Sequence, residues 1–408
     1  MQTEYMNKRE MRGQGIAKTK QIVKEKNGWL VPSASSEKKY FVDASFNCDC
    51  PDSQFHNQTC KHAYAVKYYL QKETETPQGV ETVKMRLTYK QAWGAYNRAQ
   101  TEEITHFDRL LKDLVEEVEE PEQHMGRPRV PLKEQVFCSI QKVYSQLSSR
   151  RAASLFAHAQ ERAQIGKAPC YNMVNLALNR EDMTPILMKL LALSASPLKG
   201  VESSFAVDST GFRTTNFCMY ANVKHGLKRQ HKWVKAHACV GVKTNIITAL
   251  AITGEHGADC PQFPELVKNT ANDGFDVQEV SADKAYSSQH SFNAAKEVGA
   301  TAYIPFRSNA TGTIVGNSAK AWRRAFLYFQ LNQDEFYAHY HKRSNVESVF
   351  ASIKKKFGDG LKSKNYGAQV NELLCKCIAY NIVVLIHEME ELKIEPNFSL
   401  HQSDSATS

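Results

Sequence analysis

The stretch from Tyr340 to Lys354 constrains the chain most, because its side chains form two stripes that fit a helix and no strand. It contains neither Pro nor Gly. One stripe is apolar and would pack the helix on a core; it consists of Val346, Val349, Phe350, Ile353 and Phe357. The other is polar, at spacings of three, four and seven, and consists of Tyr340, Arg343, Glu347 and Lys354.

The polar stripe offers one carboxylate flanked by two cations and a phenol. Such a set suits a metal ion and a phosphate chain better than a hydrophobic ligand. The alternative is a solvated helix face on which Arg343 and Glu347 form an ion pair worth about 0.2–0.5 kcal/mol. The stripe taken alone leaves both interpretations open.

The net charge of +9 favours a polyanionic partner. Residues 223–243 hold six Lys or Arg and no acid, and we expect Lys228, Arg229 and Lys232 in this segment to face DNA phosphates. Residues 101–122 hold nine acids against two bases and are expected to form a solvated helix or linker. A chain of 408 residues is too long for one core and should contain two or three domains.

Ten Cys in a chain without a signal-peptide pattern indicate a reducing cytoplasm, and we expect a cytoplasmic protein. The longest apolar run, near Cys377–Ile386, is interrupted by Asn381 and is too short to span a bilayer, so no membrane partner is expected. Cys375 and Cys377 lie in this apolar helix and should be structural core thiols.

Four side chains of the types that bind metal ions lie close together in the sequence: Cys48, Cys50, Cys60 and His62. Three thiols and an imidazole match a closed tetrahedral site for one structural Zn²⁺, which would support a small domain poor in apolar residues. Two β-like runs precede the cluster, at 29–32 and 39–42, and a helical run follows at 63–70. His56 could compete as a ligand. Over residues 25–70 the Cys-x-Cys…Cys-x-His pattern resembles the SWIM zinc finger, a module that binds DNA or protein.

The middle of the chain is helical by its apolar spacing. Residues 71–85 resemble a linker, residues 86–120 a helical segment, and residues 132–195 a bundle of short helices that could read duplex DNA as helix-turn-helix proteins do. The intervening Gly126-Arg-Pro-Arg129 could lie in a minor groove, although an ordinary basic linker fits as well.

From Ser204 the periodicity changes to alternating strands and helices. Strands are predicted at 205–208, 233–242, 246–253, 277–282 and 301–304, and helices at 262–269, 288–298 and 368–392. Three consecutive strands followed by alternating helix and strand predict an α/β domain with a mixed sheet flanked by helices.

Two acids follow predicted strands directly, Asp208 before a Ser-Thr-Gly turn and Asp283 after the fourth strand. If these strands are neighbours, both carboxylates face the same sheet edge, and Glu347 on the packed helix could join them. Three hard oxygen ligands suit Mg²⁺ or Mn²⁺, and two such ions roughly 4 Å apart can activate a hydroxyl and stabilise a leaving oxygen. Each Asp alone is as readily explained as a turn or helix cap.

Tyr340-x2-Arg343-x3-Glu347-x6-Lys354 resembles the carboxyl-terminal signature of DDE transposases of prokaryotic insertion sequences. Asp208-Ser-Thr-Gly and Asp283-Lys-Ala-Tyr286 resemble that family's first and second acid motifs. The resemblance spans about residues 126–390 and implies an RNase H-like fold. It also implies that Asp208, Asp283 and Glu347 bind two Mg²⁺ or Mn²⁺ ions, and that Tyr340, Arg343 and Lys354 lie near the scissile phosphate and the transposon end. Family behaviour implies at least a homodimer on paired ends.

The sequence departs from part of that family in two respects. Only 63 residues separate Asp283 from Glu347, which leaves little room for the large β insertion with which some relatives hold a flipped base at a hairpin end. A fused SWIM finger is also not general in the family. Trp233 could stack on a base, but a buried strand Trp is favoured. His256-Gly-Ala-Asp259 could contact the metal ligands and hold them in position, or it could be an ordinary turn.

The expected organisation has five parts. Residues 1–72 form the SWIM-type zinc module, 73–125 a linker with an acidic helical segment, 126–198 a helical DNA-binding region, 199–392 the RNase H-like catalytic domain and 393–408 a tail. The expected function is a metal-dependent transposase that binds terminal inverted repeats, cuts, and joins the 3′ hydroxyl to target DNA. The alternatives are a structure-specific nuclease of the same fold and a domesticated zinc-finger DNA-binding protein.

Overall fold

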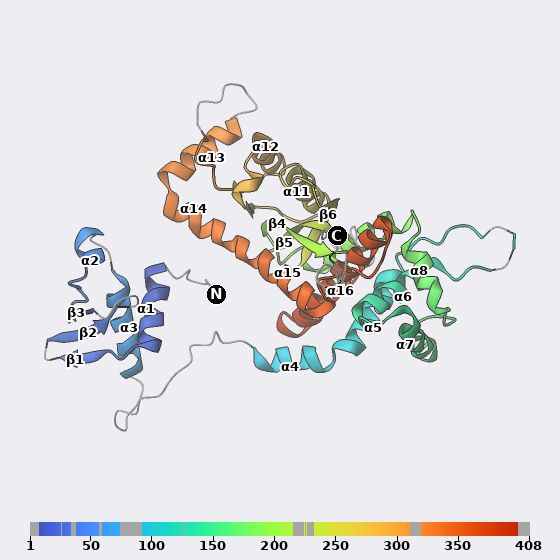
Figure 1. Cartoon of the computed structure of the whole chain (residues 1–408), viewed down its shortest axis with the longest axis horizontal. Helices are drawn as coiled ribbons and strands as arrows, with labels where there is room; N and C mark the ends of the chain where they lie inside the picture. The colour runs from blue at the N-terminus through green and yellow to red at the C-terminus, as the bar shows by residue number, and fades with distance from the viewer. Residues whose placement is uncertain are drawn as a thin grey trace, which may run out of the picture. The chain divides into compact units, whose positions relative to one another are not determined.

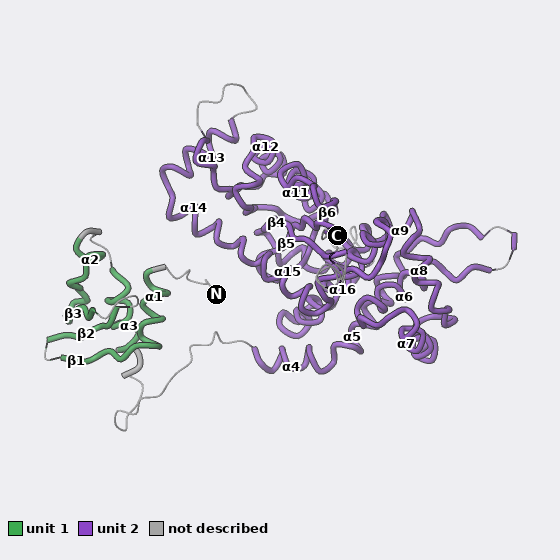
Figure 2. The backbone as a smooth tube through the Cα atoms, in the orientation of Figure 1, with its two compact units in different colours: residues 1–91 green, residues 92–408 purple. Residues whose placement is uncertain are grey.

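The structure is a computed structural model that describes residues 8–25, 27–33, 38–56, 59–73, 92–123, 125–126, 128–214, 224, 226, 232–310 and 320–398. It divides into two compact units, residues 1–91 and 92–408 (Figure 2). The two units are described separately below. The expected linker at 71–85 lies for the most part outside the described residues.

The first unit is a small α+β module built around three strands. β1 (Val23–Glu25), β2 (Gly28–Pro32) and β3 (Lys39–Asp43) form an antiparallel sheet, and α1 (Lys8–Thr19), α2 (Pro51–His56) and α3 (Lys61–Glu73) surround it. Both predicted β runs and the predicted helix are confirmed. The core holds few aliphatic side chains, among them Ile16, Val31 and Val42, and is completed by buried thiols. A core this small favours stabilisation by a metal.

The second unit begins with helices. These are α4 (Trp93–Thr101), α5 (Glu103–Val115), α6 (Leu132–Tyr144), α7 (Ser149–Glu161), α8 (Tyr171–Leu178) and α9 (Met183–Ala195), followed by the short helix η1 (Ser196–Leu198) (Figure 1).

The prediction that the acid-rich segment 101–122 is a solvated helix or linker is wrong. α5 buries Phe107, Leu110 and Leu111 in the main core because its apolar residues recur on one face. Two of its acids are buried with partners. Glu103 accepts hydrogen bonds from Tyr144 and Lys356, and Asp108 accepts them from Gln141 and Arg162. The number of charged residues therefore led to the wrong prediction for this segment, which is an amphipathic helix with one face packed in the core.

A five-stranded mixed sheet forms the centre of the second unit, in the order β6-β5-β4-β7-β8. β4 (Ser204–Arg213), β5 (Trp233–Gly241) and β6 (Ile247–Gly254) are antiparallel, and β7 (Glu279–Ala282) and β8 (Thr301–Tyr303) run parallel to β4. Helices α11 (Gln262–Asn272) and α12 (Gln289–Glu297) connect the later strands. The predicted strand and helix positions, and the RNase H-like mixed sheet flanked by helices, are confirmed.

The end of the chain packs helices against the sheet. These are α13 (Lys320–Leu331), α14 (Gln333–Tyr340), the 3-10 turn η4 (His341–Arg343), α15 (Ser344–Phe357) and α16 (Tyr366–Glu391). By length and composition α16 could cross a membrane, but 89% of its apolar window is buried inside this unit. It is therefore a core helix, and Cys375 and Cys377 lie buried within it as expected.

The expected boundaries at 125/126 and 198/199 do not separate compact units. Leu110 of α5, Ile140 of α6, Leu190 of α9, Val207 of β4 and Leu385 of α16 belong to one continuous core. Asn381, which interrupts the apolar run of α16, joins three parts of this core. Its amide pairs with both backbone groups of Ile247 at 3.0 and 2.8 Å and donates to Ser194 at 2.9 Å.

We predict that Asn381→Leu lowers the free energy of unfolding of the second unit by about 2–4 kcal/mol, because it leaves both backbone groups of Ile247 buried without a partner. Urea unfolding followed by tryptophan fluorescence measures this. Glu391→Gln, at the exposed end of the same helix, is the control and should change the free energy by less than about 0.5 kcal/mol. A stable Asn381→Leu protein would show that the amide does not hold α16 to β6.

Candidate metal-dependent active site and zinc centre

Asp208 lies within β4, because the predicted Ser-Thr-Gly turn does not form. β5 continues to pair with β4 as far as Arg213, which keeps residues 209–213 extended. The parallel partner β7 pairs with β4 only up to Val207 and ends at Ala282. Asp208 and Asp283 therefore follow the last paired residues of two adjacent parallel strands, the sheet edge at which α/β proteins bind ligands.

The helix predicted from Tyr340 onward is interrupted by the 3-10 turn η4. α14 ends at Tyr340 and α15 starts at Ser344. Glu279 of β7 holds this turn, since it pairs with Lys342 and with His339, whose ring stacks on Tyr303. The apolar stripe of α15 is buried as predicted, and the helix contacts β4 and β5. The turn and this stripe together set the positions of Arg343 and Glu347.

Arg343 joins two of the predicted acids. Its guanidinium donates to Asp208 Oδ2 at 2.5 Å and to Glu347 Oε1 at 2.6 Å. Asp208 is largely buried, and burial raises the pKa of its carboxyl group. The Ser209 amide and Arg343 lower that pKa, whereas Asp283 and Glu347 raise it further, and the net shift is upward. Asp283 and Glu347 therefore both act electrostatically on Asp208, and one guanidinium lies between Asp208 and Glu347.

The donor chemistry of this group suits a hard divalent cation. Among the described residues, however, the oxygens of the three acids are not gathered within 4.8 Å of one another, the separation met by the cysteine cluster. Asp208 and Asp283 each also accept the amide of the following residue, at 2.8 and 2.7 Å, as strand-end caps do. Cation binding would require the Arg343 guanidinium to move out from between the carboxylates.

Lys354 and Tyr340 lie close to these acids. Lys354 donates to Thr210 Oγ1 at 2.6 Å, and its ammonium lies 5.3 Å from the centroid of the Phe212 ring. Thr210 and Asp208 point to the same face of β4, because side chains alternate along a strand. The Arg343 guanidinium lies 5.9 Å from the centroid of the Tyr340 ring. The four residues of the polar stripe thus line one side of the sheet edge.

A fourth carboxylate lies on the opposite face of β4. Asp259 pairs with Lys235 at 2.6 Å and with the fully buried His237 at 3.2 Å. Burial raises the pKa of Asp259, but hydrogen bonds from Lys235 and Ser209 outweigh it, and the net shift is downward. Burial lowers the pKa of His237 to about 4. The sequence indicated the segment His256-Gly-Ala-Asp259, and of its two polar residues only Asp259 takes part in this group, since His256 is exposed. No sequence pattern indicated that Lys235 and His237, which lie on a strand, would pair with Asp259.

The predicted DNA contacts outside the signature are only partly described. Lys228 and Arg229 lie outside the described residues, as does Arg127 of the Gly-Arg-Pro-Arg segment. Lys232 is described, and its carbonyl accepts hydrogen bonds from the amide and hydroxyl of Thr214. The favoured interpretation of Trp233 as a buried strand residue is wrong, since its side chain is 41% exposed at the start of β5.

The first unit brings its four predicted zinc ligands together. The side-chain donors of Cys48, Cys50, Cys60 and His62 all lie within 4.8 Å of one another, and all four residues are buried. His62 Nδ1 lies 3.8 Å from Cys48 Sγ and 4.0 Å from Cys60 Sγ. Its other ring nitrogen is buried without a hydrogen-bond partner within the described residues. The side chain of His56 is not among those described.

Zinc fits this donor set. A thiolate sulfur and an imidazole nitrogen bound to zinc in a tetrahedron are separated by about 3.6 Å, close to the 3.8 and 4.0 Å between His62 Nδ1 and the two thiols. A hydrogen bond with Cys60 and burial raise the pKa of Cys48, and burial raises that of Cys50, whereas a hydrogen bond with Cys48 lowers the pKa of Cys60. One thiolate is therefore favoured within the cluster, and a cation bound beside it favours loss of the other two protons.

Comparison with known proteins finds a family match over each of the two parts of the chain that hold these residues. Residues 199–382 match the family model of the transposase DDE domain, and residues 40–71 match the SWIM zinc finger. The DDE match includes Asp208, Asp283 and Glu347. Among solved structures, a cryo-EM structure of piggyBac transposase in a synaptic complex with hairpin DNA is similar at 9% identity. That match covers 75% of this chain and 77% of the other with a TM-score of 0.34, which is too weak to support any argument.

We predict that Cys60→Ser reduces bound zinc from about one ion per chain to near zero, because the site loses one of four ligands. The first unit should then unfold, since structural zinc contributes its binding free energy to folding. Atomic absorption measures the zinc, and hydrogen exchange reports each unit separately. Cys170→Ser, at an exposed thiol of the second unit, is the control. Full zinc occupancy in Cys60→Ser would rule out this ligand set.

Proposed function

We propose that this chain, a DDE-type DNA transposase with an N-terminal SWIM zinc finger, binds the terminal inverted repeats of a mobile element, cuts at their ends and joins the freed 3′ hydroxyl to target DNA. The observation that carries the proposal is the pairing of Asp208 and Glu347 with one guanidinium. A strand and a helix far apart in the chain meet there, and Asp283 lies within electrostatic range of Asp208.

Asp208, Asp283 and Glu347 hold the divalent cations in this proposal, two Mg²⁺ or Mn²⁺ ions per site. Bound there, such ions activate a water or a 3′ hydroxyl and stabilise the leaving oxygen of an in-line displacement. The chain's own contribution is to hold three carboxylates at one sheet edge. Arg343 pairs with two of them in the free protein and offsets one of their two negative charges. Cations that take over this role free its guanidinium for a phosphate.

The remaining residues of the polar stripe bind the DNA. A guanidinium can bind two phosphate oxygens at once, which suits Arg343 to orienting the scissile group. Burial lowers the pKa of Lys354, and a phosphate beside it restores the preference for its charged form. Tyr340 lies beside Arg343 and forms part of the surface that contacts the transposon end.

The other parts of the chain supply binding. The zinc module, with one structural Zn²⁺, and the helices of residues 126–198 contact the transposon end or a second protein chain. Lys228, Arg229 and Lys232 belong to a basic segment suited to DNA phosphates. Two or more copies of the chain hold paired ends in a nucleoid-associated complex. Inverted repeats flanking the reading frame are the cheapest independent support for this assignment.

We predict that Asp208→Asn lowers strand cleavage of end-containing DNA in Mg²⁺ by about 10³-fold or more, because the amide removes one negative ligand from the cation site. Cleavage is measured on radiolabelled duplex. Asp276→Asn, an exposed acid of the same domain, is the control and should cut like the parent. Equal cleavage by Asp208→Asn would disprove the active site.

The same assay separates a transposase from a nuclease of the same fold. A pre-cut end with a free 3′ hydroxyl is mixed with supercoiled target DNA, and joined products are counted by sequencing. Joining requires a transposase, whereas release of ends without any joined product identifies a nuclease. End binding without cleavage in any divalent cation identifies a protein that uses DNA only as a binding partner.

A further inference from the structure

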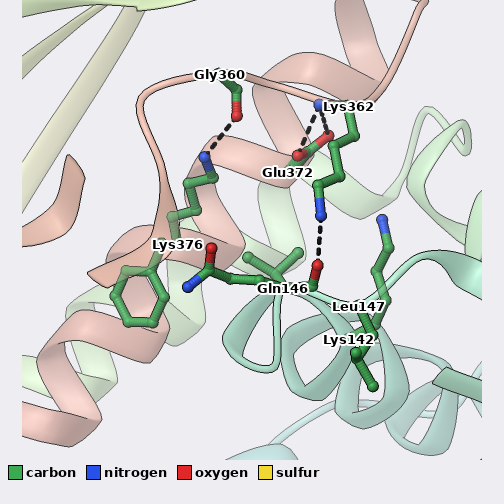
Figure 3. Close-up of a pocket in the computed structure, with 9 residues that line it drawn as sticks. Lys142, Gln146, Leu147, Gly360, Lys362, Glu372 and Lys376 are labelled. Carbon is green, nitrogen blue, oxygen red and sulfur yellow. Dashed lines mark hydrogen bonds between the residues drawn. The ribbon is translucent and has the colours of Figure 1, made fainter. Parts of the chain in front are cut away.

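A small pocket between α6, the loop that follows α15, and α16 has three lysines among the nine residues that line it (Figure 3). Its cavity measures about 20 Å³, enough for one water-sized group. The charged residues that line it are Lys142, Lys362, Lys376 and Glu372. Three ammonium groups therefore surround the cavity together with one carboxylate, an excess of two positive charges.

Two of the four charged groups hold the loop in place. Lys376 is 2% exposed and donates to the carbonyls of Gly358 and Gly360, both at 2.8 Å. Glu372 is also 2% exposed and accepts the amides of Lys362 and Ser363. Lys362 reaches across to the carbonyl of Gln146 at the end of α6. These carbonyls offset part of the positive charge as dipoles, but they carry no net charge.

Lys142 is the group that the fold leaves without compensation. It is 5% exposed, and its ammonium makes no hydrogen bond or ion pair within the described part of the chain. Figure 3 shows its side chain rising from α6 toward the loop that carries Lys362. Its ammonium is not among the polar atoms that the described residues close off from water, so it opens on the pocket. An ammonium without a partner beside two further lysines is a site that an anion completes.

The pKa values of the neighbouring lysines are shifted in the direction expected for a site that binds an anion. Burial lowers the pKa of Lys376 to about 8, and Glu372 offsets only part of this. Burial and the charge of Lys142 lower the pKa of Lys362. A bound anion reverses both effects, because it stabilises the charged form of every ammonium around it.

The pocket lies beside the strand that carries Asp208. Its loop runs along the end of β4, where the Arg213 amide donates to the Asp359 carbonyl at 2.9 Å and the Leu361 amide donates to the Arg213 carbonyl at 2.7 Å. Five residues of strand, from Asp208 to Arg213, span about 17 Å at 3.3 Å per residue.

We infer that this lysine pocket binds one backbone phosphate of the DNA substrate, about 17 Å from the phosphate that is cut. A cavity of this size admits a single non-bridging oxygen and leaves the rest of the phosphate outside, at the exposed Lys362. The identity of the anion as DNA rests on the proposed function. A free inorganic anion has the same chemistry, and the experiment separates the two sources.

Lys142→Met tests the inference, because methionine keeps most of the side-chain volume and removes the charge. Binding of a duplex carrying the element's end is measured against salt concentration, with Asp208→Asn in every protein so that no DNA is cut. The slope of log affinity against log salt should fall by about one in Lys142→Met. Lys296→Met, which removes an exposed charge on α12, is the matched control and should leave the slope unchanged.

A second measurement locates the phosphate. Neutral methylphosphonates are placed one at a time along the duplex, and one position should weaken binding about tenfold in the parent and not in Lys142→Met. Equal slopes for the two methionine variants, or no such position, overturn the inference while the proposed function stands. A parent protein that binds no DNA overturns the proposed function as well.

Thermal melting separates the two anion sources. The melting temperature of Lys142→Met should not fall, since methionine keeps the packing of the buried side-chain stem and the substitution removes an ammonium that makes no ion pair within the described residues. If the Lys142→Met protein does not fold, Lys362→Met, at the mouth of the pocket, is used in its place in both DNA measurements. Sulfate that raises the melting temperature of the parent but not of the variant, together with unchanged DNA binding, assigns the pocket to a free anion and overturns the DNA assignment.

Discussion

The packing of α15 on β4 is the contact on which the rest of the second unit depends. Val346, Val349 and Ile353 are buried against the sheet, and their burial fixes which side of the helix faces the edge where the parallel strands end. Glu347 and Arg343 then lie opposite Asp208. The polar group is therefore positioned by hydrophobic burial, and it needs no stabilising energy of its own.

Three places in the chain gather groups of like chemistry. Three thiols meet in the first unit, and two carboxylates meet across Arg343 with a third nearby. Three lysines line the pocket together with Glu372. The groups at each place carry, or can take up, charges of one sign that the neighbouring residues offset only in part, and a ligand of opposite charge would complete that compensation.

Sequence reasoning succeeded where the information was local. The ligand spacing of the zinc module, the buried stripe of α15 and the order of strands and helices after Ser204 all follow from patterns a few residues long, and the structure contains each of them. It failed where a distant partner decided the outcome. The acid-rich α5 is buried because α6 and α16 cover it, and residues 209–213 stay extended because β5 pairs with them.

The sequence by itself determined which chemical groups the chain possesses and which of them share a helix face or a strand end, since these depend on periodicity and spacing. Only the tertiary structure decided which groups meet. Asp208 and Glu347 share one guanidinium, Asp259 lies behind β4 with His237, and Lys142 faces Lys362 and Lys376 across a cavity. Such contacts join residues that lie far apart in the chain, and they depend on how the whole core packs.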